Sequence, residues 1–224
     1  KPKAVPVARL LKGGVGYIAL DRFSKTASRE VENALKLLII DDAKGVILDL
    51  RNNPGGLLQE AVKIVNLFVP KGQLVVSTKS NISSYNQEFK TTKQPLSLEI
   101  PLVILINEKS ASASEIVAGT LQDLDRAVIL GKRSFGKGLV QRPKPMPYGG
   151  QLKVTISRYY TPSGRCIQAL DYRNRGRNGE ASEYLKIDYK AFKTLNGRTV
   201  FDGGGVSPDV LGKNKERSKF IEGL

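Results

Sequence analysis

Residues 102–124 read LVILINEKSASASEIVAGTLQDL and indicate the fold class most clearly, because they join a continuous apolar strand to a serine-rich turn and then to an amphipathic helix. A second unit of this kind lies upstream. There the apolar run Val46–Leu50 meets the loop Arg51–Gly56, and a helical period follows over residues 57–68. Strands that alternate with helices in this way are typical of a parallel α/β sheet. We call residues 107–115 the serine turn and residues 51–56 the glycine loop.

The rest of the pattern agrees with this fold class. Further strands are predicted at residues 15–20, 74–78 and 127–130, a helix at residues 31–39, and an edge strand near residues 85–89. Two strand-like segments, at residues 139–147 and 151–160, flank Tyr148-Gly149-Gly150, which is a hairpin signal. We therefore expect an α/β core of βα units with an added β-hairpin that gives the sheet a mixed edge.

Composition narrows the choice of function. The chain has 224 residues, of which 40% are hydrophobic and 25% charged, and this suits one globular domain. The net charge is +15, but the Lys and Arg residues are spread along the chain. We favour a solvated basic surface over a nucleic-acid site, because no aromatic-interleaved RNA-binding signature is present. Cys166 is the single cysteine, so no internal disulfide can form, and we expect it to be a bystander.

The sequence contains no histidine, which excludes a Ser-His-Asp triad. A nucleophilic serine would need another base, and the glycine-flanked Lys137 in Ser134–Gly138 is the candidate. A free lysine is almost fully protonated at neutral pH, with a pKa of ~10.4. As a base, this lysine would need an apolar environment and no tight carboxylate partner.

The glycine loop and the serine turn should face each other if their strands are neighbours, because loops that follow parallel strands emerge at one edge of the sheet. Gly55 and Gly56 would expose backbone N–H groups. Ser112 would open the next helix, with the N–H of Ala113 pointing outward. These donors outline an oxyanion hole, in which one donor is worth about 10²–10³ in rate.

Each segment also has an ordinary structural explanation. The sequence from Ser112 to Glu115 fits a capping box, in which the two side chains satisfy the start of a helix. The glycine loop could be a simple βα turn. Lys137 could be a surface lysine, as most lysines are.

Seven segments occur in a set order across most of residues 15–210. They are Gly16-Tyr17-Ile18, Asp49–Gly56, Ser110–Ile116, Ala118–Asp123, Gly136–Gln141, Tyr160–Arg165 and Gly205–Asp209. No single segment is decisive, but the ordered set resembles the C-terminal processing, or tail-specific, peptidases.

This resemblance implies a serine endopeptidase with a Ser/Lys dyad on a fold like the Clp protease and crotonase folds. The family nucleophile is the middle serine of Ser-Ala-Ser-Ala-Ser, 25 positions before the lysine, which selects Ser112 and Lys137 here. Gln141 would orient the lysine. Residues four apart in a regular strand lie ~13 Å apart, so this contact requires a bend at Gly138.

The resemblance assigns the oxyanion hole to the same backbone N–H groups of the two loops. It requires no metal or cofactor. Positions that support the family's site correspond to Asp49, Arg51 and Glu115, which ion pairing or capping would explain equally well.

The resemblance also predicts the domain organisation and setting. Residues 1–14 would be a linker or the remnant of an upstream PDZ domain, residues 15–212 the catalytic domain, and residues 213–224 a basic tail. The implied partners are polypeptide substrates bound through their C-terminal segments, not nucleic acid, and an oligomer is compatible with this. The implied setting is the bacterial cell envelope, periplasmic or on the membrane exterior.

Two other functions fit the same residues. A crotonase-like acyl-CoA enzyme would use the two backbone N–H groups on a thioester. A non-catalytic peptide-binding module would use the serines only to cap a helix.

Overall fold

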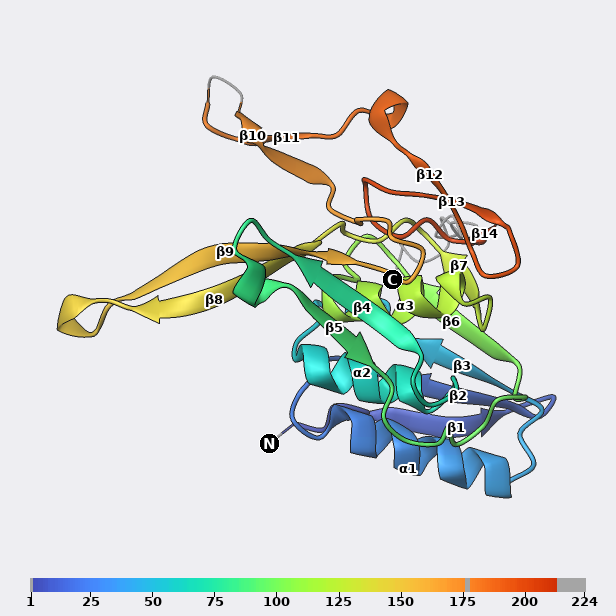
Figure 1. Ribbon diagram of the computed structural model, residues 1–224. Helices are drawn as coiled ribbons and strands as arrows, with labels where there is room; N and C mark the ends of the chain where they lie inside the picture. Colours follow the sequence, from blue (N-terminus) through green and yellow to red (C-terminus); the bar gives the residue numbers. More distant parts are fainter. Residues whose placement is uncertain (1, 176–177, 213–224) are drawn as a thin grey trace, which may run out of the picture.

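Six strands form the central sheet of the computed structural model, which describes residues 2–175 and 178–212 (Figure 1). They are β1 (Val7–Leu11), β2 (Val15–Ala19), β3 (Gly45–Asp49), β6 (Leu102–Ile106), β7 (Val128–Gly131) and β14 (Val210–Leu211). Their spatial order is β1-β2-β3-β6-β7-β14. The strands from β2 to β14 are parallel, and β1 pairs antiparallel with β2. The predicted α/β class is therefore confirmed.

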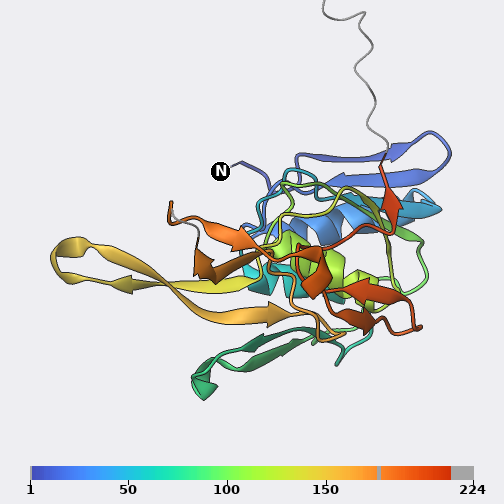
Figure 2. The same ribbon diagram turned by 90° about the horizontal axis from the view of Figure 1, so that it is seen from above.

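Helices α1 (Ala27–Ile40), α2 (Leu58–Asn66) and α3 (Ala113–Asp123) pack on this sheet. Helix α1 contacts β2, α3 contacts β7, and α2 lies between the two helices (Figures 1 and 2). Every residue of α3 is buried. A helix that is buried all round must be covered on both sides, so a further layer lies against it.

That layer is a second sheet of order β5-β4-β9-β8. Its strands are β4 (Leu74–Lys79), β5 (Gln87–Lys90), β8 (Leu139–Pro145) and β9 (Gln151–Tyr160), with a 3₁₀ turn η1 (Ser83–Tyr85) between β4 and β5. Thr120 Oγ1 of α3 donates to the Val75 carbonyl of β4 at 2.7 Å, which ties the layers together. Strand β9 pairs with β4 only from Tyr160 to Arg158, so the rest of the hairpin projects from the body (Figure 1). We call residues 139–160 the arm.

The prediction that this hairpin gives the parallel sheet a mixed edge is wrong. The free edge of β7 is occupied by β14, where Val210 pairs with Leu130, so no edge remains there for the hairpin. The strand at residues 74–78 likewise belongs to the second sheet. The mixed edge of the central sheet is formed by β1.

Both ends of the described chain contain structure that the sequence analysis did not predict. Ala4 is fully buried and β1 forms a hairpin with β2, so ordered structure crosses the expected boundary at residue 15. Two small hairpins follow the arm, β10–β11 and β12–β13, with a 3₁₀ turn between them. Their bounds are β10 (Leu170–Arg175), β11 (Ala181–Glu183), η3 (Lys186–Asp188), β12 (Ala191–Lys193) and β13 (Thr199–Phe201). The predicted tail, residues 213–224, lies outside the described residues. Among the helices that are described, none combines the length and the apolarity needed to cross a membrane.

Candidate active site

The glycine loop and the serine turn meet at the carboxyl edge of the central sheet, as the sequence predicts. Strands β3 and β6 are neighbours there. The side chains of Asn52 and Asn107 join the two loops, since Asn107 Nδ2 donates to Asn52 Oδ1 at 2.9 Å. Deeper in the fold, Ala111 N donates to the Asn53 carbonyl at 3.0 Å. One hydrogen bond between side chains and one between backbones therefore fix the relative position of the two loops.

The three alternating serines of the turn have different environments. Ser110 Oγ donates to the Leu50 carbonyl at 2.7 Å, and Ser114 Oγ donates to the Asn53 carbonyl at 3.0 Å. Both side chains are fully buried. Ser112 is half-buried, and its backbone has φ +56° and ψ −112°, a region that non-glycine residues rarely occupy. The fold thus binds the two outer serines and presents the middle one in a strained turn.

Gly55 lies directly against this strained turn. A β-carbon at Gly55 would stand 2.6 Å from the Ala111 carbonyl oxygen and 2.9 Å from Ala113 N, and its φ is +96°. Only glycine allows this approach. The N–H of Gly55 already donates to Asn53 Oδ1 at 2.8 Å. Within the described part of the chain, no hydrogen bond is donated by the N–H of Gly56 or of Ala113.

Glu115 links the serine turn to the lysine segment. Its Oε2 accepts from Ser112 N at 2.8 Å and from Lys137 N at 2.9 Å. Its Oε1 accepts from Ser134 Oγ and from Gly136 N, both at 2.6 Å. One carboxylate therefore holds the backbones of the two predicted dyad residues, although they lie 25 positions apart in the sequence.

The environment of Glu115 is unusual for a charged side chain, because its exposed fraction is 0%. Burial raises the pKa of this carboxyl group, and the hydrogen bonds from Ser134 and from three backbone N–H groups oppose that rise. All four partners are donors, which matches the acceptor capacity of an ionised carboxylate. The capping explanation and the site explanation are compatible, because the bond to Ser112 N is one half of a capping box.

Lys137 is half-buried beside this carboxylate. Within the described part of the chain, its Nζ forms no ion pair and no hydrogen bond. The segment is fixed through its backbone instead: Gly138 N donates to Gln168 Oε1 at 2.8 Å, and Ala169 N donates to the Gly136 carbonyl at 2.9 Å. The lysine thus meets one requirement for a base, the lack of a carboxylate partner, at a position set by its neighbours.

Gln141 does not join this group in the structure. It lies exposed on β8, and its side-chain amide donates to Thr155 Oγ1 at a long 3.5 Å. No hydrogen bond between Gln141 and Lys137 is found among the described residues. A register shift between Val140 and Gln141 alters the alternation of side chains along β8.

Asp49 and Arg51 form an ion pair at the end of β3. Arg51 Nη2 lies 2.6 Å from Asp49 Oδ2, and Tyr17 Oη donates to the same oxygen at 2.7 Å. Burial alone would raise the pKa of Asp49, but the hydrogen bonds from Arg51 and Tyr17 outweigh it and the pKa lies below its ordinary value. The two residues therefore hold each other where the glycine loop begins.

Several residues that the sequence analysis did not select help to position the site. Asn53 is fully buried and binds both loops, and Ser134 joins Glu115 to Val206 N. Both are short polar residues, Asn53 in the glycine loop and Ser134 in the glycine-containing segment Ser134–Gly138. Two other segments of the ordered set, Ala118–Asp123 and Tyr160–Arg165, have a structural role. Arg165 is fully buried and pairs with Asp123 at 2.8 Å, which ties the end of α3 to the chain after β9.

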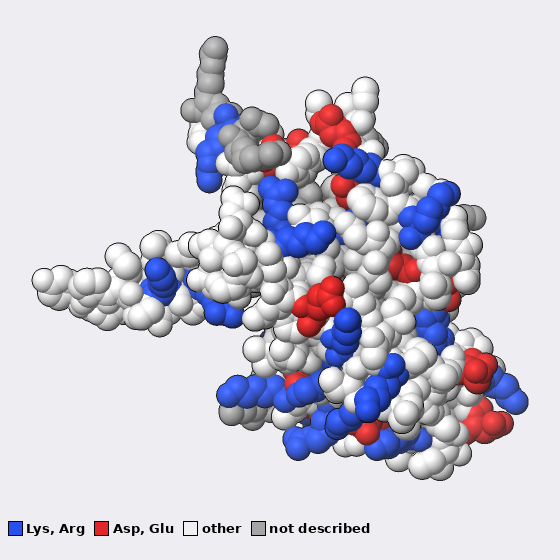
Figure 3. Space-filling model, in the orientation of Figure 1, with Lys and Arg blue, Asp and Glu red and all other residues white. Residues whose placement is uncertain are grey.

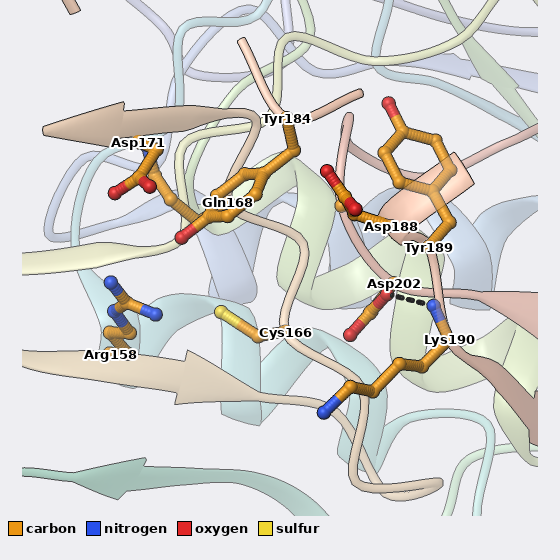
Figure 4. A pocket seen from close by; sticks show the side chains of 10 residues that line it. Arg158, Cys166, Gln168, Asp171, Tyr184, Asp188, Tyr189, Lys190 and Asp202 are labelled. Atoms are coloured by element: carbon orange, nitrogen blue, oxygen red, sulfur yellow. Dashed lines mark hydrogen bonds between the residues drawn. The ribbon is translucent and has the colours of Figure 1, made fainter. Parts of the chain in front are cut away.

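A cavity of about 430 Å³ is lined by β9 and by segments that follow it in the chain (Figure 4). Gln168, the partner of Gly138, is part of its wall, together with Arg158, Asp202 and the side chain of Cys166. Burial raises the pKa of the Cys166 thiol, which disfavours the nucleophilic thiolate. Across the described residues, no cluster of three or more Cys, Asp or Glu side chains could hold a metal ion.

Comparison with known proteins gives consistent matches. The profile of Peptidase family S41 matches residues 14–173. The carboxy-terminal-processing protease of Bartonella bacilliformis is 42% identical over 172 residues, which are 75% of this chain and 39% of that protein. The carboxyl-terminal-processing protease of Synechocystis sp. is 44% identical over 156 residues, or 70% of this chain and 36% of that protein. The chain spans less than half the length of these curated relatives.

A solved structure gives the same result. The structure titled photosystem II D1 C-terminal processing protease aligns with a TM-score of 0.68 and 29% sequence identity. The alignment covers 94% of this chain and 46% of that one. The likeness therefore includes the regions after residue 173, which the family profile does not match.

Proposed function

The chain belongs to peptidase family S41, and we propose that it carries the catalytic unit of a serine endopeptidase that cleaves proteins in or near their C-terminal region. The observation that best supports this proposal is the shared carboxylate of Glu115, which binds the backbone N–H of Ser112 and of Lys137. The names of the relatives support the C-terminal preference. The parallel βα units, with the site at their carboxyl edge, support the finer proposal of a Clp protease/crotonase-like fold.

In the proposed first step, Ser112 Oγ attacks the carbonyl carbon of the scissile peptide bond, and its proton passes to the neutral amine of Lys137. Negative charge then develops on the former carbonyl oxygen. The N–H groups of Ala113 and Gly56 are free to bind it, whereas that of Gly55 already donates to Asn53. We therefore assign the oxyanion hole to Ala113 and Gly56, with Gly55 providing the close approach.

In the second step, the tetrahedral intermediate collapses and the peptide C–N bond breaks. Lys137 returns its proton to the leaving amine, and the N-terminal part of the substrate stays attached to Ser112 as an ester. Water then attacks the ester, Lys137 accepts a proton from that water and returns it to Ser112 Oγ, and a new carboxyl terminus is released. Each step balances without a metal or a cofactor.

The proposal also covers the substrate, an additional domain, the cellular setting and the residues that position the site. We propose that substrates enter through their C-terminal segments, that a PDZ domain acts upstream of the catalytic unit, and that the protein works in the bacterial cell envelope. Glu115, Asp49 and Arg51 are proposed as positioning residues. Gln141 would reach the lysine only after a rearrangement of β8.

The test is cleavage of an unstructured polypeptide by this chain and its variants. Replacement of Ser112 by Ala, or of Lys137 by Ala, should lower the rate by about 10³-fold or more, because either change removes the activated nucleophile. The matched control is Lys132→Ala, since Lys132 is an exposed lysine near the same segment. A serine-directed phosphonate should label wild-type protein at Ser112, as identified by mass spectrometry.

Other outcomes would favour the rival functions. Unchanged cleavage by both variants would contradict the dyad. Peptide binding without turnover or labelling would favour the non-catalytic binding module. Tight CoA binding without proteolysis would favour the acyl-CoA enzyme.

A further inference from the structure

A groove of about 1120 Å³ runs along one face of the arm. Its floor is made by β9, whose apolar side chains Leu152, Val154 and Ile156 line it together with Thr155, Ser157, Arg158 and Tyr160. Its far wall is the end of β4 with the turn η1, from Lys79 to Tyr85. We call this space the arm groove.

The charges that line the arm groove are all positive. Four basic side chains contribute to it: Lys79, Arg142, Lys144 and Arg158. Within the described part of the chain, none of the four has an ion-pair partner and no carboxylate lines the groove. Figure 3 shows blue side chains and no red ones on the visible face of the arm. An anionic partner would therefore meet Lys79, Arg142 and Lys144 without a competing carboxylate. Arg158 also lines the smaller cavity, which contains carboxylates of the protein.

Aromatic rings hold two of these cations in place. Lys79 Nζ lies 4.8 Å from the centre of the Tyr160 ring, and the Arg142 guanidinium lies 5.7 Å from that of Tyr85. These contacts position the charged groups without neutralising them. Two of the four cations are thus positioned by contacts with aromatic residues of the groove.

The register of the arm matches an extended polypeptide. Lys144 pairs with Leu152 and Arg142 with Val154, so cations of β8 stand beside apolar residues of β9 on the same face. An extended chain presents every second side chain to one side, at a spacing of ~6.6–6.8 Å. A segment that places acidic and apolar side chains on one face would satisfy both features. A bare phosphate backbone would use the cations and leave the apolar floor unpaired.

One end of the arm groove is close in sequence to the proposed catalytic lysine. Leu139 lines the groove and is two residues after Lys137. A substrate that leaves the site in this direction would pass directly into the groove.

We propose that the arm groove binds an acidic, partly apolar segment of the polypeptide substrate next to the bond that is cut. The proposal rests on the proposed peptidase function and names the substrate class that this chain selects. Selection acts on binding, since the groove residues do not touch the reacting atoms.

Binding can be measured without catalysis in the Ser112→Ala protein. The probes are a short fluorescent peptide rich in Glu and Leu and its counterpart with every Glu changed to Gln. Anisotropy should show tighter binding of the Glu peptide, by about tenfold at low salt, and the difference should shrink as salt is raised. Equal binding of the two peptides would overturn the proposal.

A matched pair of variants locates the effect. Lys144→Glu reverses a charge in the arm groove. Lys153→Glu reverses one on the same hairpin at a position that does not line the groove, next to Leu152 in β9. We expect Lys144→Glu to weaken binding of the Glu peptide by about fivefold, and Lys153→Glu to change it by less than about twofold. Equal effects of the two changes would mean that only net charge matters and would overturn the proposal.

Two further outcomes separate this inference from its alternatives. A single-stranded DNA that binds more tightly than the Glu peptide, and that loses affinity in Lys144→Glu, would make the groove a nucleic-acid site and overturn the proposal. In an active protein, Lys144→Glu should raise KM for an acidic substrate and leave kcat unchanged. If the charge preference holds in the binding assay while the wild-type chain cuts nothing, the proposed function fails and the groove assignment stands.

Discussion

Polar side chains are buried and hydrogen-bonded around the serine turn, whereas those of the arm are exposed. Around the turn, Ser110, Ser114 and Glu115 are fully buried, and each is hydrogen-bonded to a neighbouring loop. On the arm, every residue from 141 to 153 is exposed, and the cations of the groove have no ion-pair partner among the described residues. The first region suits chemistry, which needs fixed geometry, and the second suits recognition of varied sequences.

The two regions join at the lysine segment. Gly138 is packed so closely that a β-carbon there would lie 2.8 Å from Gln168 N, and the arm begins at the next residue. The proposed base therefore stands where buried structure gives way to exposed structure. We therefore expect changes near the turn to alter both stability and rate, and changes on the arm to alter binding alone.

Among residues that only position the site, Glu115→Gln should have the largest combined effect on stability and rate. Each oxygen of Glu115 accepts from two donors, so an amide NH₂ in place of either oxygen points donor hydrogens at two other donors. The hydrogen bonds at that atom are lost and the facing donor groups repel each other. We expect a loss of about 3 kcal/mol in the free energy of unfolding. The rate should fall by about 10²-fold, because the serine and the lysine lose their common support.

The control for this change is Glu108→Gln, an exposed glutamate of the same turn. It should leave both quantities within experimental error. Denaturant unfolding and steady-state cleavage measure the two effects. A Glu115→Gln protein with normal rate and stability would show that the carboxylate does not organise the site.

A smaller effect is expected for Gly55→Ala, and Gly72→Ala is its control. Both glycines have left-handed backbones, with φ +96° at Gly55 and +87° at Gly72. A β-carbon at Gly72 meets nothing within 4 Å, whereas one at Gly55 meets the serine turn. Gly72→Ala should cost about 1 kcal/mol through backbone strain. Gly55→Ala should cost more, because its β-carbon would also overlap backbone atoms of the serine turn, and it should lower the rate by about tenfold or more. Equal rates in the two variants would mean that the close approach of the glycine loop has no catalytic importance.

The sequence predicted the central sheet well because local patterns specify it. The apolar run at residues 102–106 became β6 with the same bounds, and the neighbouring positions of β3 and β6 followed from the rule for parallel strands. The arm was also predicted as a hairpin from its turn residues. Its sheet was assigned wrongly, because the pairing of β7 with β14 depends on residues about 80 positions later, which no local pattern reveals.

The candidate site could be predicted in its parts but not in its connections. The resemblance selected Ser112, Lys137 and Glu115, yet only the fold shows that one carboxylate binds the backbones of the other two. Asn53 could not be selected from the sequence, because its role depends on the bonds it forms in the folded, buried loop and not on the residue type alone. The arm groove was missed for a similar reason. The Lys and Arg residues are spread along the sequence, and only the pairing of β9 with both β8 and β4 gathers four of them around one groove.

The smallest effect on stability is expected for Leu152→Ala, and this change tests the comparison most directly. Leu152 is 51% exposed on the arm, whereas Leu48 in β3 is 0% exposed. Truncation of Leu48 should cost about 3–5 kcal/mol, because it removes a buried side chain and leaves a cavity. Truncation of Leu152 should cost less than about 0.5 kcal/mol, yet it should weaken binding of the Glu and Leu peptide by a few-fold, because the apolar floor of the groove is lost. A Leu152→Ala protein that is unstable would mean that the arm is part of the folded core. One that is stable and binds normally would mean that the floor does not contact the substrate. Either result would remove the distinction between a region built for chemistry and a region built for recognition.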